Sequence, residues 1–122
     1  MASIRGHNTK PEIRVRSVLH KMGFRFRLHR NDLPSRPDIV LPRHRKIIQV
    51  YGCFWHCHRG CKISHDPKSN TEYWTPKLAR TVERDAKNLR MLEDLGWKVL
   101  ILWECEVREK DPLILRLQNF LA

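Results

Sequence analysis

Two short runs, Asp38-Ile-Val-Leu-Pro42 and Ile47-Ile-Gln-Val-Tyr51, are dominated by β-branched and other apolar residues and are joined by the basic segment Arg43-His-Arg-Lys46. Apolar runs of this length, bounded by turn-forming or charged residues, are typical of β-strands. We therefore predict two adjacent strands joined by a basic turn, and the rest of the fold is built outward from this pair.

Two elements are predicted upstream of the pair. Thr9-Lys-Pro-Glu12 combines a capping box with a proline near the first helical position, which predicts the start of a helix that ends at Gly23. The apolar face of this helix is expected to contain Ile13, Val15, Val18, Leu19 and Met22. Apolar and polar residues then alternate from Phe24 to His29, which predicts a half-exposed strand, and residues 31–37 are expected to form a loop.

Three features downstream complete the predicted fold. A long helix is expected from about Thr75 to Gly96, with an apolar face made of Leu78, Val82, Leu89, Leu92 and Leu95. The nearly all-apolar run Trp97-Lys-Val-Leu-Ile-Leu-Trp103 predicts a central strand covered on both faces, and Asp111-Pro112 is expected to cap a closing helix. The order α-β-β-β-α-β-α predicts an α/β fold with a mixed central sheet flanked by helices. No repeat or linker interrupts the chain, so residues 1–122 are expected to form one domain.

The charge of the chain favours a polyanionic partner. Lys and Arg number 24 against 13 Asp and Glu, which gives a net charge of +11. Each neutralised phosphate releases condensed counterions, so such a surplus favours nucleic acid; a solubilising surface, a ribosomal protein or a membrane-surface protein are the alternatives. No run is apolar and long enough to span a bilayer, and the N-terminus lacks a signal-peptide core, so we expect a cytoplasmic protein without membrane contact.

Cysteine and histidine are concentrated in Cys53-Phe-Trp-His-Cys-His-Arg-Gly-Cys61, and Cys105 follows the last predicted strand. In a reducing cytoplasm, close Cys and His spacing indicates a metal site before it indicates disulfides. The four zinc ligands of first choice are Cys53, His58, Cys61 and Cys105. His56 and Cys57 are alternative ligands, and a set of buried cysteines without metal is the other interpretation. A saturated shell of four ligands leaves no open position, so the expected zinc is structural.

With these motifs in view, the chain resembles the very-short-patch-repair (Vsr) DNA mismatch endonucleases along nearly its whole length. The matching stretches are Ile4-Arg-Gly-His-Asn-Thr-Lys-Pro-Glu12, Leu33-Pro-Ser-Arg-Pro-Asp-Ile-Val40, Gly52-Cys-Phe-Trp-His56, Thr71-Glu-Tyr-Trp74, Val82-Glu-Arg-Asp85 and Gly96-Trp97 through Trp103-Glu-Cys105. Six stretches in the same order make the resemblance specific. It implies a restriction-endonuclease-like fold, and a bacterial, nucleoid-associated enzyme that nicks the thymine strand at T:G mismatches arising from deaminated 5-methylcytosine. It also implies a zinc ion that shapes the site and Mg²⁺ that drives hydrolysis.

The resemblance also implies roles for individual residues. The carboxylate of Asp38 and the backbone carbonyl of Val50 would hold Mg²⁺, His56 would be the general base, and Glu12 would orient water or His56. Imidazole suits a base because its ordinary pKa lies near neutrality. The alternatives are a turn aspartate at Asp38, a zinc ligand at His56 and simple helix capping at Glu12. Tyr51 stands where family members commonly have histidine, which leaves a phosphate or relay role there open.

Three aromatic residues, Phe54, Trp55 and Trp74, resemble the intercalating residues of the family. A T:G wobble stacks poorly, so an apolar wedge can open the duplex there at lower cost than at a paired site. Core packing is the alternative, and Trp97 and Trp103 fit it better because they lie on a predicted strand. Phosphate contacts are expected from basic residues, among them Arg14, Arg16, Lys21, Arg25, Arg27, Arg43, Arg45 and Lys46.

Other interpretations of the function stay open. A nuclease of the same fold could act on another substrate, and a zinc-stabilised DNA-binding module could lack catalysis altogether. The chain starts close to its first motif, so the basic N-terminal arm usual in the family is expected to be short or truncated. Mismatch-repair proteins are the candidate protein partners. A monomer is expected, because a mismatch lacks the two-fold symmetry that favours a dimer.

Overall fold

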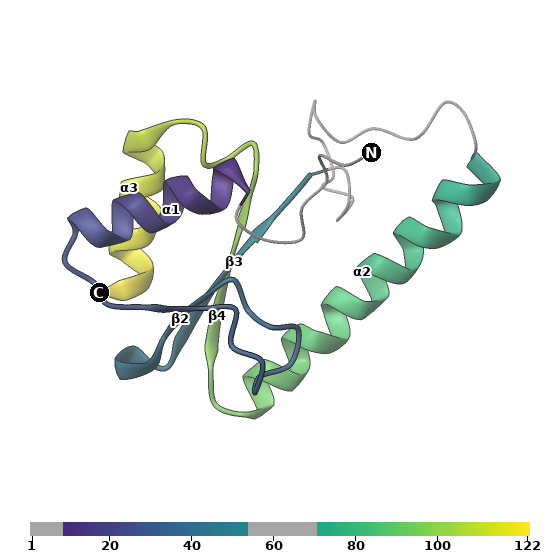
Figure 1. The fold of residues 1–122 in the computed structure, drawn as a ribbon, viewed down its shortest axis with the longest axis horizontal. Coiled ribbons are helices and arrows are strands. Elements are labelled where there is room, and N and C mark those ends of the chain that lie inside the picture. Colours follow the sequence, from purple (N-terminus) through teal and green to yellow (C-terminus); the bar gives the residue numbers. More distant parts are fainter. Residues whose placement is uncertain (1–8, 54–70) are drawn as a thin grey trace.

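The computed structural model describes residues 9–53 and 71–122, with the backbone alone for residues 71–74. The elements run in the order α1 (Lys10–Lys21), β1 (Arg27–Leu28), β2 (Ile39–Leu41), the short 3-10 helix η1 (Pro42–His44), β3 (Lys46–Tyr51), α2 (Thr71–Asp94), β4 (Lys98–Trp103) and α3 (Lys110–Leu121). The predicted α-β-β-β-α-β-α order is therefore confirmed, and Figure 1 shows its arrangement in space. In the described part of the chain, no helix is both long and apolar enough to cross a membrane.

The strands form a mixed four-stranded sheet in the order β1-β2-β3-β4. The pairs β1–β2 and β2–β3 are antiparallel, whereas β3 and β4 run parallel with Tyr51 opposite Trp103. Parallel neighbours require a long crossover connection, and α2 lies within it. The carboxyl ends of β3 and β4 consequently meet at one edge of the sheet, where the Cys53 N–H donates to Glu104 Oε1 at 3.2 Å.

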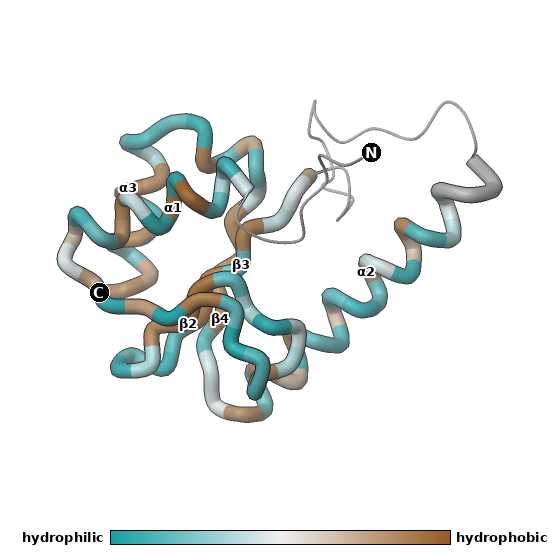
Figure 2. The backbone as a smooth tube through the Cα atoms, viewed as in Figure 1, coloured by the Kyte–Doolittle hydropathy of each residue, from teal (hydrophilic) through white to brown (hydrophobic). Residues whose placement is uncertain are grey.

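The central pair β2–β3 is covered on both faces. Ile39, Leu41 and Ile48 pack with α1 and α3, which lie together on one side of the sheet (Figure 1). Val40 and Ile47 point to the opposite face and pack with Leu92 of α2 and with Trp97. In Figure 2 hydrophobic residues follow these strands, while α2 is mostly hydrophilic along its length. The mostly apolar sequences of β2 and β3 thus reflect two buried faces rather than one.

Strand β4 differs from its prediction. The run from Trp97 to Trp103 was expected to be the central strand, but β4 lies at the edge of the sheet that the described residues form. Only Leu102 is fully buried in it, and Val99, Leu100 and Ile101 are half-buried. Strand β4 is apolar because its faces pack against helices. An edge strand can be covered in this way just as a central strand can, so its sequence does not distinguish the two positions.

The predicted helix faces and boundaries also need correction. Helix α2 begins at Thr71 rather than near Thr75, so Trp74 lies in its first turn and not in a loop. Pro76 consequently lies inside the helix rather than near its first position. Three residues assigned to apolar faces, Ile13, Val82 and Leu95, are exposed.

Two smaller elements were also predicted differently. The strand expected over residues 24–29 pairs only at Arg27–Leu28, although Phe24 and Phe26 still pack against the core. The cap of α3 is Glu109 without a side-chain hydrogen bond, and Asp111 lies in the first turn of the helix. A carboxylate in this turn still interacts favourably with the helix dipole, so Asp111 stabilises the start of α3 without being its cap.

Two leucines of α3, one buried and one exposed, allow the contribution of core packing to stability to be measured. Leu117 is 0% exposed in the α1–α3 layer, whereas Leu115 on the same helix is 58% exposed. We expect Leu117→Ala to lower the free energy of unfolding by about 2–5 kcal/mol, because it leaves a cavity that the surroundings fill only partly. Leu115→Ala should change it by less than about 0.5 kcal/mol. Urea unfolding followed by circular dichroism measures both, and equal losses would contradict the packing described for α3.

Candidate active site

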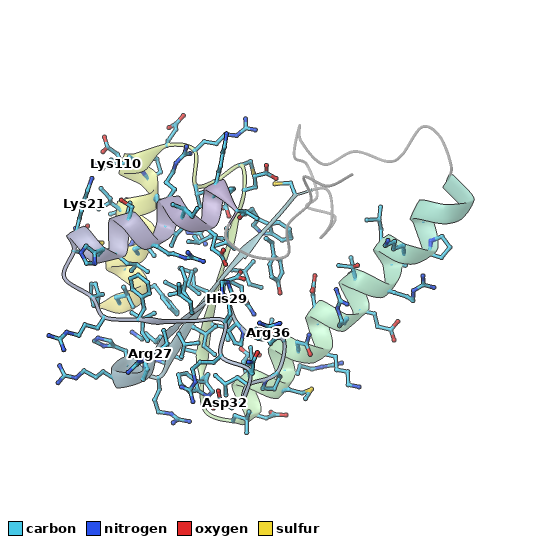
Figure 3. All side chains as sticks on the ribbon, in the orientation of Figure 1. Lys21, Arg27, His29, Asp32, Arg36 and Lys110 are labelled. Atoms are coloured by element: carbon cyan, nitrogen blue, oxygen red, sulfur yellow. The ribbon has the colours of Figure 1, made fainter. Side chains whose placement is uncertain are left out.

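Three titratable side chains from three separate segments meet beside the sheet. They are Glu12 in the first turn of α1, His29 directly after β1 and Asp38 directly before β2. One potential ligand atom from each residue lies within 4.8 Å of those of the other two. Figure 3 shows His29 near the middle of the molecule, whereas Asp32 of the following loop lies toward its lower edge. The fold thus gathers two carboxylates and an imidazole at one place.

Glu12 is a buried carboxylate, 2% exposed. Its Oε1 atom is 2.9 Å from Nε2 of His29, and its Oε2 atom accepts a hydrogen bond of 2.9 Å from Arg16, one helical turn later. The Glu12 N–H itself donates to the Thr9 hydroxyl at 3.4 Å, so the predicted cap at Thr9 is present. Because each carboxylate oxygen has a polar partner, the orientation of the Glu12 side chain is fixed.

Asp38 is hydrogen-bonded to the backbone near the end of β3. Its Oδ2 atom accepts a hydrogen bond of 2.7 Å from the Val50 N–H, and its own N–H donates to Gln49 Oε1 at 3.1 Å. The buried Gln49 side chain also donates to the Ser35 hydroxyl at 2.9 Å. Gln49 therefore joins the loop before β2 to β3, and Asp38 is held against the backbone of Val50.

The electrostatics of the site disfavour a second negative charge. The pKa of Asp38 is raised to about 8, mainly by burial and in addition by the charge and hydrogen bonding of Glu12, while the Val50 N–H and the charge of Arg16 act in the opposite direction. Two adjacent carboxylates in a poorly solvated space cannot both ionise readily, so a proton or a cation must be shared between them. Carboxylate oxygens suit hard divalent cations, and the donor set fits such an ion.

Tyr51 is the last residue of β3 and lies near enough to Asp38 to be affected by its charge. Its ring meets that of Trp103 edge to face, with 5.4 Å between the ring centroids. Burial raises the pKa of the Tyr51 phenol well above its usual range, and the nearby charges of Asp85 in α2 and Asp38 add to this effect. The Tyr51 hydroxyl therefore keeps its proton at neutral pH and is able to donate a hydrogen bond.

The predicted zinc ligands are described only in part. Cys53 is buried just after β3, and Cys105 is half-buried just after β4. The bond between the Cys53 N–H and the Glu104 carboxylate places Cys53 beside the residue that precedes Cys105. The remaining candidates of the Cys/His-rich segment, Phe54, Trp55, His56, His58 and Cys61, lie outside the described residues, as does the side chain of Trp74.

His29 is the one described residue of this cluster that was not predicted from the sequence. Its place in the alternation from Phe24 to His29 suggested an exposed polar position on a strand. Leu28 pairs with Ile39, so the next residue outward, His29, stands opposite Asp38, and the His29 N–H donates to the Asp38 carbonyl at 3.4 Å. A predicted antiparallel register between these two segments would have brought His29 to the site.

The raised pKa of Asp38 predicts a pH-dependent stability. Between about pH 4 and about pH 8 the folded protein binds a proton on Asp38 that the unfolded chain has released, so raising the pH through this window destabilises the fold. Asp38→Asn carries no such charge. Without added divalent cation, the variant should gain on the order of 1–3 kcal/mol relative to the wild type at about pH 8, and almost none at about pH 4.

Urea unfolding at several pH values measures this difference, and the exposed Asp94 at the end of α2 supplies the control variant, Asp94→Asn. The gap between Asp94→Asn and the wild type should not grow with pH. A constant gap for Asp38→Asn across the same window would contradict the shared burial of Asp38 and Glu12.

The sequence of the chain is similar to those of known proteins. The family model of the DNA mismatch endonuclease Vsr matches residues 1–62, which include α1, β2 and β3. The chain is 48% identical to the type II nicking enzyme V.XorIIP of Xanthomonas oryzae pv. oryzae over 121 residues, covering 99% of this chain and 88% of that protein.

Two further relatives are similar over somewhat smaller parts of their length. The type II nicking enzyme V.NmeAIP of Neisseria meningitidis is 43% identical, with 90% of this chain and 78% of the relative covered. The DNA mismatch endonuclease Vsr of Escherichia coli is 41% identical, with 93% and 72% covered. Identity at this level over most of both chains shows that this chain and its relatives descend from a common ancestor. The chain therefore belongs to the Vsr family of DNA mismatch endonucleases.

Proposed function

We propose that the chain nicks the thymine-containing strand of duplex DNA at T:G mismatches by Mg²⁺-dependent hydrolysis, with residues 1–122 acting as one restriction-endonuclease-like domain. The observation that carries the proposal is the position of Asp38, fixed against the Val50 backbone and beside the buried Glu12. The relatives named as nicking enzymes support cleavage of one strand, and the relative named as a mismatch endonuclease supports the mismatched substrate.

Each site residue has a distinct part in this reaction. The Asp38 carboxylate and the Val50 carbonyl would hold Mg²⁺, which supplies charge stabilisation at the phosphate and a more acidic water when bound. Glu12, held by Arg16, would orient the attacking water, and His56 would take its proton. The protonated Tyr51 hydroxyl would donate to a phosphate oxygen.

A structural zinc ion belongs to the same proposal. Cys53 and Cys105, which follow the adjacent parallel strands β3 and β4, would bind it together with His58 and Cys61. Such a centre would brace the segment that carries Phe54, Trp55 and His56. The proposal is supported by the bond from the Cys53 N–H to Glu104, which keeps the two strand ends together.

The substrate would be recognised by charge and by insertion. The net charge of +11 attracts the phosphate backbone, while Phe54, Trp55 and Trp74 would enter the poorly stacked mismatch. We further propose a bacterial cytoplasmic enzyme that acts as a monomer at the nucleoid, in very short patch repair of deaminated 5-methylcytosine, with mismatch-repair proteins as partners.

The test compares labelled duplexes that differ only in T:G against T:A, in several flanking sequences, with Mg²⁺ and zinc-loaded protein. We expect a nick in the thymine strand of the mismatched duplex alone. Asp38→Ala should slow it by at least about a hundredfold, because it removes the carboxylate that holds the ion. Asp94→Ala, which removes an exposed carboxylate at the end of α2, should nick at the wild-type rate.

Other outcomes would point to other functions. Cleavage of the T:A duplex at a comparable rate would indicate a nuclease of the same fold with another substrate. Tight binding of every duplex, with or without Mg²⁺ and without any product, would indicate a DNA-binding module that has lost catalysis.

A further inference from the structure

His29 stands where a cation held by Asp38 could reach it. The antiparallel register places His29 opposite Asp38, and the bond from the His29 N–H to the Asp38 carbonyl holds the two backbones together. His29 also has a positive φ of 48°, in the left-handed region, where non-glycine residues are uncommon and are found at functional sites. The backbone thus places His29 beside Asp38, and the contact of Nε2 with Glu12 Oε1 at 2.9 Å directs the imidazole toward the carboxylates.

The separations within the cluster suit a single ion. In an octahedral site with metal–ligand distances of about 2.1 Å, neighbouring ligand atoms lie about 3.0 Å apart and opposite ones about 4.2 Å apart. His29 Nε2 and Glu12 Oε1 are 2.9 Å apart, and the potential ligand atoms of all three residues lie within 4.8 Å of one another. Small side-chain movements would bring the three atoms around one cation.

A cation can take the place of the proton that joins Glu12 to His29. The hydrogen bond between them uses Glu12 Oε1, while Arg16 holds the other oxygen, Oε2, at 2.9 Å. Binding of a cation at Oε1 and Nε2 would leave the Arg16 contact unchanged. The Glu12 carboxylate would thus stay oriented by α1 while its other oxygen turned to the ion.

The ligand chemistry indicates which ion benefits. Mg²⁺ prefers oxygen ligands and gives up its waters reluctantly, whereas imidazole suits first-row transition metals, and Mn²⁺ accepts carboxylate and imidazole together. We propose that His29 is the nitrogen ligand of the catalytic cation, beside Asp38 and Glu12, and that it makes the site prefer Mn²⁺ to Mg²⁺. The inference rests on the proposed function, because it adds a ligand to the cation site of that same reaction and concerns which divalent cation the site binds more tightly, whereas cleavage itself is proposed with Mg²⁺.

Metal binding tests the assignment without relying on cleavage. Mn²⁺ is titrated into the full zinc-loaded chain, free Mn²⁺ is measured by electron paramagnetic resonance, and Mg²⁺ is added as competitor. His29→Gln keeps a hydrogen-bond donor for Glu12 but removes the imidazole. We expect its Mn²⁺ affinity to fall by about tenfold or more and its Mg²⁺ affinity by less than about threefold. His20→Gln, at an exposed position of α1, is the matched control and should bind both ions as the wild type does.

Electron spin-echo measurements on the Mn²⁺-loaded protein identify the ligand directly. The wild type should show modulation from a bound nitrogen, and His29→Gln should lack it. Absence of nitrogen modulation in the wild type would overturn the proposal whether or not the variant folds. So would modulation that survives in His29→Gln and disappears in His56→Gln.

The two proposals fail in different ways. Thymine-strand nicking by the wild type together with an unchanged Mn²⁺ affinity in His29→Gln would overturn the role of His29 and leave the proposed function standing. Nitrogen modulation that depends on His29 would support the ligand assignment even if no duplex were cut. That absence of cleavage would overturn the proposed function.

Discussion

The carboxylates of Glu12 and Asp38 lie close together, and Glu12 is buried. Ionising both carboxylates at once therefore costs free energy, and the neighbouring residues reduce this cost. In such surroundings a charge is costly unless it is paired or bonded to donors. The structure supplies Arg16 from α1, His29 from the end of β1 and the Val50 N–H from β3. Three elements of the fold thus provide groups that stabilise the two carboxylates, and the site favours the binding of a positive charge.

The sheet explains why this arrangement is held firmly. Strands β2 and β3 are buried on both faces, so the residues at their ends, Asp38 and Val50, have little freedom to move apart. Strand β4 runs parallel to β3, which brings Cys105 to the edge where Cys53 emerges. The Val50 backbone that holds Asp38 and the candidate zinc ligand Cys53 thus lie at the same end of β3. Displacement of its end would disturb both groups together.

Much of this could be predicted from the sequence, because local chemistry decides it. The cap at Thr9, the apolar runs of β2 and β3 and the order of the elements are local signals, and the structure has all of them. The edge position of β4 and the exposure of Val82 could not be predicted, because both depend on which elements pack together. His29 was missed for the same reason. Its neighbours in sequence suggest a surface strand, whereas its neighbour across the ladder is Asp38.

The same electrostatics separate DNA binding from hydrolysis. The chain carries a net charge of +11, which draws a polyanion toward it at long range. The pair formed by Glu12 and Asp38 is locally acidic, and an ionised pair would repel the phosphate that has to be cut. In the proposed reaction, the cation would change the sign of the field at this one place, while the net positive charge of the chain would attract the duplex with or without the ion. If the proposed reaction holds, the chain would bind DNA before it is able to cut, and a cation at Asp38 would control the step from one to the other.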